Sequence, residues 1–329
     1  MKDNFSSGSD KYAQYRPTYP EAFFDFLKQL LPVTDNAWDC ATGNGQVAQK
    51  LALIFNKVYA TDISQSQLDN AVQLPNIHYA LQPAESTSFQ NHFFDLIIVG
   101  QAVHWFQFDA FYAEVKRTGK EGALIVLIGY GNLHINTAID AIIHELYETI
   151  LGPYWDAERR YVDEEYQTLP FPFEEIEAPQ FDNTYQWTLE HLVGYLNTWS
   201  AVKHYTKQNG HNPVDVIYKN LQQAWGSYET LPVHFPLLLR IGRITKMSFS
   251  QSLHIFATIY YFGALINCYM KRKQTFTLLL LLLFTVGTLL FIKESNDHKE
   301  CSDRYESTKD SNGNLVVSKQ HICQEKYSF

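Results

Sequence analysis

The sequence has few cations and few cysteines, and it contains no internal repeat. Its 26 Lys and Arg are outnumbered by 35 Asp and Glu, which gives a formal net charge of -9, and no long basic run occurs. Because neutralising a phosphate backbone requires clustered cations, this composition argues against a general nucleic-acid-binding protein. The cysteines form no CxxC pair, and no histidine lies at a spacing that would complete a metal site; they are Cys40, Cys268, Cys301 and Cys323. We therefore expect neither a metal nor a nucleic-acid partner.

The composition is that of a folded chain. Hydrophobic residues make up 46% and charged residues 19% of its 329 positions, which fits a globular protein with a sizeable core and excludes a disordered one. Aromatic residues reach 15%, a share that suits either an enclosed ligand chamber or ordinary core packing. The length indicates one large domain with an appendage, or two domains.

Strand and helix patterns alternate through the first 130 residues. This alternation predicts an α/β fold, with βαβ units that build a parallel sheet covered by helices on both faces. The expected strands are 37–40, 58–61, 77–80, 96–100 and 123–128, and the expected helices are 20–31, 46–55, 65–73 and 108–116.

The alternation lapses between residues 132 and 230, which we interpret as a cap inserted before the last strands. Helical patterns occur at 137–151, 189–200 and 213–225, and Tyr166–Trp187 is rich in proline and aromatic residues. After the cap, Val233–Ile244 resembles a final edge strand, where Pro236 is tolerated because an edge strand leaves one row of N–H groups unpaired.

A glycine-bearing turn follows the first expected strand and indicates a ligand site. In open α/β sheets ligands bind at the carboxyl ends of the strands, and small residues there let the backbone approach a ligand. Asp62 ends the second strand, where its carboxylate is placed to accept hydrogen bonds from a ribose diol. The segment Gly43-x-Gly45-x-x-Ala48 matches the dinucleotide fingerprint, so a nicotinamide-dependent oxidoreductase is one reading. Asp39 instead favours a cationic ligand such as S-adenosylmethionine.

Five ordered segments resemble class I S-adenosylmethionine-dependent methyltransferases of the trans-aconitate methyltransferase-like (methyltransferase type 11) group. They are Tyr12-x-x-Tyr15-Arg16-Pro17-x-Tyr19-Pro20, AWDCATGNGQVA, ATDIS, VGQAVHWF and PLLLRIGRI. The resemblance covers about residues 5–245 and implies a Rossmann-like seven-stranded methyltransferase sheet with S-adenosyl-L-methionine as cofactor. One position departs from the family, whose first loop glycine is Ala41 here. If that position requires a positive φ, the alanine costs about 1 kcal/mol or more.

The resemblance also implies which residues contact the cofactor. Gly43 and Gly45 line its methionine end, with Asp39 nearby. Asp62 binds the ribose, and Ile63 packs on the adenine side. Three further residues complete the expected set: Ala84 and Glu85 flank the adenine, as Pro83-Ala84-Glu85 follows the third strand, and Gln101 reaches the sulfonium region.

The acceptor side is expected to involve His104, Trp105 and Arg16. Transfer of a methyl group to a carboxylate needs little acid–base help, so catalysis would rest on positioning and desolvation. His104 is either a base for a hydroxyl or amine or a packed strand-end histidine. Arg16 either pairs with a carboxylate of acceptor or cofactor or closes a surface helix. Further candidate walls of a chamber, or core residues, are Tyr15, Tyr130 and Trp199.

We therefore expect residues 1–245 to form a methyltransferase domain that acts on a small molecule, in which an organic acid carboxylate is a candidate group. The alternatives are the nicotinamide oxidoreductase and a non-catalytic scaffold that binds the cofactor. The sequence names neither the acceptor nor the oligomeric state.

Residues 275–292 form an uncharged, leucine-rich run that predicts a C-terminal transmembrane helix. At ~1.5 Å per residue the run extends ~27 Å, close to the ~30 Å of a bilayer core. The basic residues 271–273 precede it, and the positive-inside rule then places the enzyme in the cytoplasm of a single-pass membrane protein. Residues 246–274 are a juxtamembrane segment or a possible first span. Residues 293–329 form a polar tail on the outside, where Cys301 and Cys323 are able to pair.

Overall fold

The computed structural model describes residues 14–245, 301–309 and 315–323. The chain divides into two units, Met1–Lys246 and Met247–Phe329. Within the described residues, no helix is both long and apolar enough to cross a membrane. The predicted span at 275–292 and the segment 246–274 lie outside the described residues, as do parts of the polar tail.

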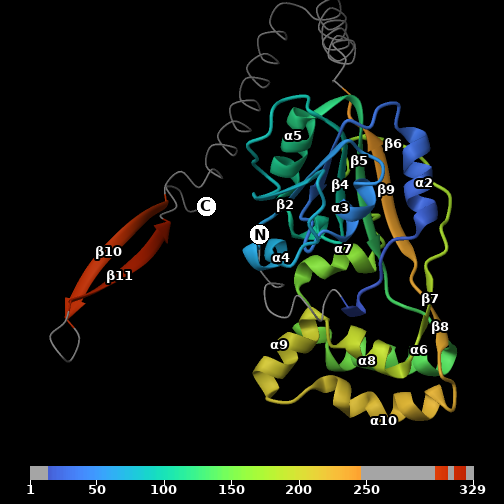
Figure 1. The fold of residues 1–329 in the computed structure, drawn as a ribbon. Helices are drawn as coiled ribbons and strands as arrows, with labels where there is room; N and C mark the ends of the chain where they lie inside the picture. The colour runs from blue at the N-terminus through green and yellow to red at the C-terminus, as the bar shows by residue number, and fades with distance from the viewer. Residues whose placement is uncertain (1–13, 246–300, 310–314, 324–329) are drawn as a thin grey trace, which may run out of the picture. The chain divides into compact units, whose positions relative to one another are not determined.

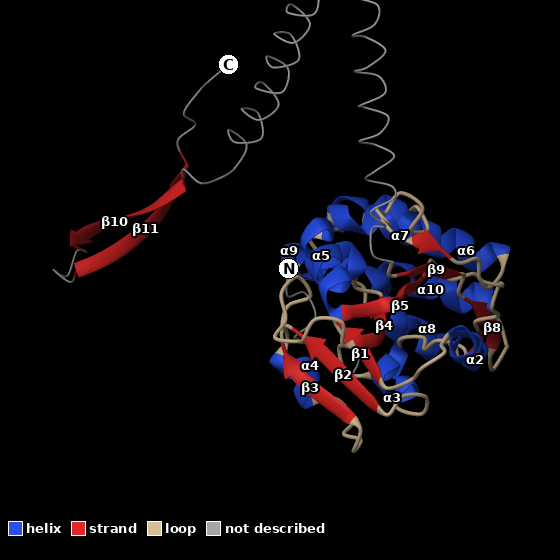
Figure 2. Cartoon of the chain, turned by 90° about the horizontal axis from the view of Figure 1, so that it is seen from above, coloured by secondary structure: helices blue, strands red, loops and turns tan. Residues whose placement is uncertain are grey.

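Among the described residues, seven strands of the first unit form one mixed sheet (Figures 1 and 2). Their order is β3-β2-β1-β4-β5-β9-β6; β3 to β5 run parallel, and β9 runs antiparallel to both β5 and β6. Their bounds are β1 Asn36–Cys40, β2 Lys57–Asp62, β3 Ile77–Leu81, β4 Phe94–Gly100, β5 Gly119–Tyr130, β6 Glu174–Glu175 and β9 Leu237–Arg243. The carboxyl ends of β1, β2 and β4 therefore meet at one edge of the sheet.

Helices cover both faces of this sheet, as the alternation predicts. In β4, Leu96 and Ile98 belong to one buried cluster, whereas Ile97 and Val99 belong to another, because successive side chains of a strand point to opposite faces. The first cluster includes residues of α2 (Glu21–Leu30) and α3 (Gln46–Leu51), and the second includes residues of α5 (Phe108–Thr118). The short helix α4 (Gln65–Asp69) follows β2.

The cap forms a helical layer apart from the sheet (Figure 1). Its long helices are α6 Thr137–His144, α8 Leu189–Leu196, α9 Ser200–Asn209 and α10 Pro213–Trp225. The expected helix at 137–151 changes to a π-helical turn, η2, at Glu145–Ile150. The expected helix at 189–200 ends at Leu196, and α9 is a separate helix that the sequence pattern did not reveal. The insertion is also not continuous, because β6 at Glu174–Glu175 returns to the main sheet.

The prediction of one final edge strand at Val233–Ile244 is wrong. The segment is divided at Phe235 and Pro236 into β8 (Leu231–His234) and β9. β8 pairs with β7 (Thr184–Trp187), whereas β9 lies between β5 and β6 in the main sheet. Proline has no N–H to donate to a ladder, so the chain leaves one sheet at this point and enters the other.

In the second unit, β10 (Cys301–Lys309) and β11 (Leu315–Cys323) form an antiparallel hairpin. Cys301 and Cys323 are register partners in this ladder. The pairing of their thiols stays a prediction.

Candidate functional site

The loop after β1 is shaped by residues in the left-handed backbone region. Gly43 has a φ of +57° and Gly45 a φ of +82°, and both conformations are natural for glycine. A Cβ at Gly45 would also lie 2.3 Å from the hydroxyl oxygen of Tyr79, so this position has no space for a side chain. Gly45 then precedes α3. The two glycines thus allow a tight strand-to-helix turn beside the sheet edge.

Ala41 adopts a φ of +56° in the same loop. This position therefore has the positive φ at which an alanine is strained, because its Cβ clashes with the backbone in the left-handed region. The cost is about 1–2 kcal/mol relative to glycine. The loop keeps its shape because its neighbours hold it, and Thr42 donates its backbone N–H to Thr61 at 2.9 Å.

Asp39 is an almost fully buried carboxyl group at the end of β1, 1% exposed. Burial raises its pKa to about 7, while hydrogen bonds from Thr42 and from the Ala48 backbone oppose that rise. The Thr42 hydroxyl donates to Oδ2 of Asp39 at 2.5 Å. A buried acid of this kind is stabilised in its ionised form by a cation, which supports a positively charged ligand.

Asp62 links the loops that follow β1 and β2. Its Oδ2 accepts from the Gly43 N–H at 2.9 Å, and its Oδ1 accepts from the Ser64 N–H at 2.9 Å. A carboxylate accepts several hydrogen bonds at once, so this position is compatible with the ribose role predicted from the sequence. The sequence assigned Asp62 to the ribose, and the structure adds that it also holds the glycine loop.

These strand ends enclose a cavity, which we call the strand-end cavity. Its lining includes seven of the residues predicted from the sequence, namely Arg16, Asp39, Gly43, Asp62, Ile63, Gln101 and Trp105. The charged residues among those that line it are Arg16, Asp39 and Asp62. Two acids and one arginine suit a cationic cofactor with a ribose. A pyrophosphate would instead face repulsion from both carboxylates.

Four predicted site residues do not line the strand-end cavity. Gly45 lies under Tyr79, and His104 lines the neighbouring chamber described below. Ala84 is buried in the cluster that contains Trp38, and Glu85 accepts from the Gln107 N–H at 3.0 Å. Both follow β3, and neither is among the residues that line the cavity.

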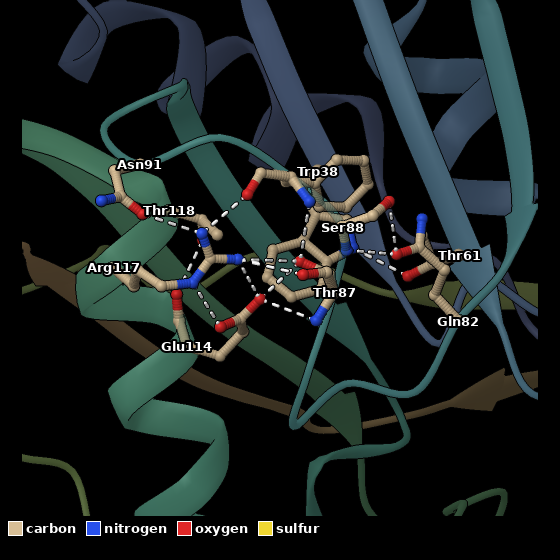
Figure 3. A network of polar contacts seen from close by, with 10 residues as sticks. Trp38, Thr61, Gln82, Thr87, Ser88, Asn91, Glu114, Arg117 and Thr118 are labelled. Carbon is tan, nitrogen blue, oxygen red and sulfur yellow. Dashed lines mark hydrogen bonds and ion pairs between the residues drawn. The ribbon is translucent and has the colours of Figure 1, made fainter.

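A network centred on Arg117 stabilises this loop after β3 (Figure 3). Arg117 donates to Glu114, to Asn91, and to the carbonyl oxygens of Thr87 and Phe89. Glu114 in turn accepts from the N–H and hydroxyl of Thr87. The loop that carries Ala84 and Glu85 is therefore anchored to α5 by charge-assisted hydrogen bonds.

Gln101 directly follows β4 and has a φ of +54°, a strained value for a residue other than glycine. Its backbone N–H donates to Ile128 at 2.8 Å and its side-chain Nε2 donates to Tyr130 at 3.0 Å, so β5 holds it in place. Non-glycine residues in this region concentrate at functional sites. Gln101 and Trp105, the last residue of the 3-10 turn η1 (Val103–Trp105), line the strand-end cavity and a second one, and they form the wall that the two share.

A second cavity, the tryptophan chamber, lies beyond this wall. It is lined by Arg16, Gln101, His104, Trp105, Trp155, Asp156, Arg159, Trp199 and Ser200. Arg16, Gln101 and Trp105 line both cavities. The cap supplies five of these residues from segments that bear no recognised motif, namely Trp155, Asp156, Arg159, Trp199 and Ser200.

His104 is buried at the tryptophan chamber with 8% of its surface exposed. Burial, and then the nearby charge of Arg159, lower its pKa to about 3. The ring is therefore neutral at physiological pH and a weak base. Its Nδ1 is buried and has no hydrogen-bond partner within the described residues.

Arg16 is placed by residues of the sheet and the cap. Its guanidinium donates to the Tyr130 hydroxyl at 3.2 Å and to the Thr198 carbonyl at 3.4 Å, and it lies 5.4 Å from the Tyr195 ring centroid. Among the three aromatic wall candidates, Tyr130 lines the strand-end cavity and Trp199 the tryptophan chamber. Tyr15 packs against His191 instead and lines neither of the two.

Several residues that line the two cavities were not expected from the sequence. Thr42, Ser64 and Gln67 line the strand-end cavity, and Trp155 and Arg159 line the tryptophan chamber. Thr42 was visible inside the glycine loop, whereas Gln67 could be inferred only from the placement of α4. Within the described residues, no cluster of side chains is arranged to hold a metal ion.

Comparison with known proteins gives matches across the first unit. A family model described as a methyltransferase domain matches residues 38–127. A Dictyostelium discoideum protein named as a methyltransferase is 31% identical over 249 residues, which cover 73% of this chain and 95% of that protein. A Mycobacterium tuberculosis protein named as a methyltransferase is 28% identical over 196 residues, covering 59% and 75% respectively. A solved structure from Anaeromyxobacter dehalogenans, described as a type II methyltransferase, is 38% identical with a TM-score of 0.66 and covers 70% of this chain and 99% of that one.

Proposed function

Because the chain belongs to the class I S-adenosylmethionine-dependent methyltransferases, we propose that it methylates a small-molecule acceptor, with an organic acid carboxylate as the favoured group. The observation that carries this proposal is the adjacency of two cavities. The strand-end cavity suits the cofactor, and the tryptophan chamber shares Arg16, Gln101 and Trp105 with it. An acceptor in the chamber would thus lie directly beside the cofactor.

S-adenosylmethionine supplies an electrophilic methyl group on a sulfonium. The chain's residues bind and orient the two reactants. Asp39 and Asp62 favour a cationic, ribose-bearing cofactor, and Arg16 is placed at the wall to pair with an acceptor carboxylate. A carboxylate is already ionised at neutral pH, so the reaction needs no proton transfer. The tryptophan walls exclude water and thereby make the carboxylate a better nucleophile.

The pKa of His104 supports the same choice of acceptor. A base for a hydroxyl or amine works best with a pKa near the working pH, whereas that of His104 is lowered to about 3. Because the chain belongs to a methyltransferase family, we interpret the glycine loop as that of a methyltransferase and not as that of a nicotinamide-dependent oxidoreductase. The experiment must also distinguish an active methyltransferase from a non-catalytic scaffold that only binds the cofactor.

Two measurements on the full chain test the proposal. Calorimetry should detect binding of S-adenosylhomocysteine but not of NAD. The chain is then incubated with a metabolite extract and S-adenosylmethionine labelled in the methyl group. Mild alkali should release the label as volatile methanol, because carboxyl methyl esters hydrolyse where N-methyl and C-methyl products do not. Label only in RNA or protein would refute a small-molecule acceptor, and cofactor binding with no transfer would support the scaffold.

We further propose that one helix at about residues 275–292 anchors the chain in a membrane, with the catalytic domain cytoplasmic. The support is the uncharged run and the basic residues 271–273 before it. Alkaline carbonate should leave the full chain in the membrane pellet. A membrane-impermeant thiol reagent should label reduced Cys301 and Cys323 in intact cells. Recovery of the chain in the supernatant would remove the anchor, and labelling only after lysis would contradict the orientation.

A further inference from the structure

Arg159 occupies the part of the tryptophan chamber that belongs to the cap. It ends the 3-10 turn η4 (Ala157–Arg159), which packs against η1, and it does not line the strand-end cavity. Arg16 lines both cavities, whereas Arg159 lines the tryptophan chamber alone. Of the two arginines, Arg16 is therefore the one that borders the strand-end cavity.

The Arg159 guanidinium is fixed by three acceptors. Its Nε donates to the Tyr147 hydroxyl at 2.9 Å and lies 3.3 Å from Oδ1 of Asp163, while Nη2 donates to Asn132 at 2.8 Å. Nη1 makes no hydrogen bond within the described residues. The guanidinium carbon also lies 5.1 Å from the Trp155 ring centroid. A fork that is held on one side and open on the other is pre-organised for an anion.

The π-helical turn η2 (Glu145–Ile150) contributes to this placement through Tyr147. The Tyr147 hydroxyl donates to Asp163 at 2.6 Å, and its backbone carbonyl accepts from the Trp155 indole at 3.1 Å. One residue therefore positions both the cation and an aromatic wall of the chamber. π-helical turns inside helices are frequent at functional sites.

The chamber carries an excess of positive charge. Its lining includes Arg16 and Arg159 against one acid, Asp156. Lys203 is close enough to Arg16 that burial and this neighbouring charge lower its pKa, just as burial and Arg159 lower that of His104. The carboxylate of Asp163 compensates part of the Arg159 charge. An anionic ligand at the Arg159 guanidinium would compensate the rest of that charge.

We propose that Arg159 binds an anionic group of the acceptor that is remote from the methylated atom, with Nδ1 of His104 making a second hydrogen bond to the bound acceptor. This inference rests on the proposed function, and it adds that the acceptor has two polar ends. The methylated end lies at Arg16 and the cofactor, and the anionic end lies at Arg159 between Trp155 and Trp199. Arg159 is then a specificity-determining residue.

The experiment titrates matched probes into the full chain saturated with S-adenosylhomocysteine. The probes are succinate and terephthalate, each compared with its monoamide, which has nearly the same size but one charge fewer. The parent should bind the better dicarboxylate at least about tenfold more tightly than its monoamide, because a charged hydrogen bond is lost in the amide. Arg159→Gln should abolish this preference, and Arg159→Lys should retain part of it.

Arg160→Gln is the matched control. Arg160 is the next residue and donates to the Tyr161 hydroxyl, but it does not line the chamber, so its variant should behave like the parent. Unchanged affinity for S-adenosylhomocysteine in Arg159→Gln shows that the fold is intact. An undiminished dicarboxylate preference in Arg159→Gln would overturn the inference, as would the absence of any dicarboxylate binding to the cofactor-bound parent. Failure to bind S-adenosylhomocysteine would instead refute the proposed function.

Discussion

Thr42 and Asp39 form a 2.5 Å hydrogen bond inside the glycine loop, in which the hydroxyl donates to the buried carboxyl group. This bond lowers the pKa of Asp39, but burial outweighs it and leaves the pKa at about 7. The free protein thus holds an acid that is costly to ionise and that a cation would stabilise. Function and stability are opposed at this residue.

Asp39→Asn should weaken cofactor binding and stabilise the free protein. The pKa of Asp39 rises from 3.8 unfolded to about 7 folded, so the folded state binds the extra proton between these values. The stability contributed by this group is present below pH 3.8 and is lost as the pH rises to 7. At pH 8 the free energy of unfolding of the variant should therefore be about 1–3 kcal/mol greater than that of the parent, and the variant should unfold at a higher temperature. Both differences should shrink towards pH 4. Thermal scans at several pH values measure this, with the exposed Asp25→Asn as control. Equal melting temperatures at pH 8 would contradict it.

Ala41→Gly should stabilise the domain. Ala41 has a φ of +56°, and glycine removes the Cβ clash at that angle. The expected gain is about 1 kcal/mol, or roughly 2–4 °C in melting temperature for a domain of this size. Calorimetry with S-adenosylhomocysteine should show equal or tighter binding. A lower melting temperature would mean that the entropy of the added glycine outweighs the relief of strain.

The pH dependence of methyl transfer should lack a histidine inflection. His104 has a pKa lowered to about 3 and so does not change charge between pH 5 and 8. At saturating cofactor and acceptor, kcat should be flat over this range. The KM for S-adenosylmethionine should rise below pH 7, because Asp39 becomes protonated in the free enzyme. A kcat that increases through pH 6–7 would instead indicate a histidine base.

Arg117→Ala should destabilise the first unit. The substitution leaves the low-exposure carboxylate of Glu114 without its cation and frees the loop after β3 (Figure 3). We expect a loss of about 1–3 kcal/mol. Urea unfolding measures the stability, and the exposed Lys28→Ala is the control. If Arg117→Ala is as stable as Lys28→Ala in urea, the network does not hold the loop.

The sequence alone determined the five parallel strands of the sheet and several of the residues at their carboxyl ends. The glycine spacing, Asp39 and Asp62 lie within a few residues of strand ends, and parallel strands bring their carboxyl ends to one edge. Local patterns therefore placed residues that are distant in the chain at the same edge. The alternation of strand and helix was sufficient for this, because each pattern is set by neighbouring residues.

The tertiary structure decided the tryptophan chamber. Arg159 and Trp155 join Gln101 and His104 only because the cap folds over the sheet edge, and no local pattern encodes that packing. The tertiary structure also decided where the chain is divided into β8 and β9 at Pro236, the backbone strain at Ala41 and the protonation of buried groups. Desolvation depends on everything that surrounds a side chain, so Asp39 and His104 have pKa values that their own sequence neighbours do not reveal.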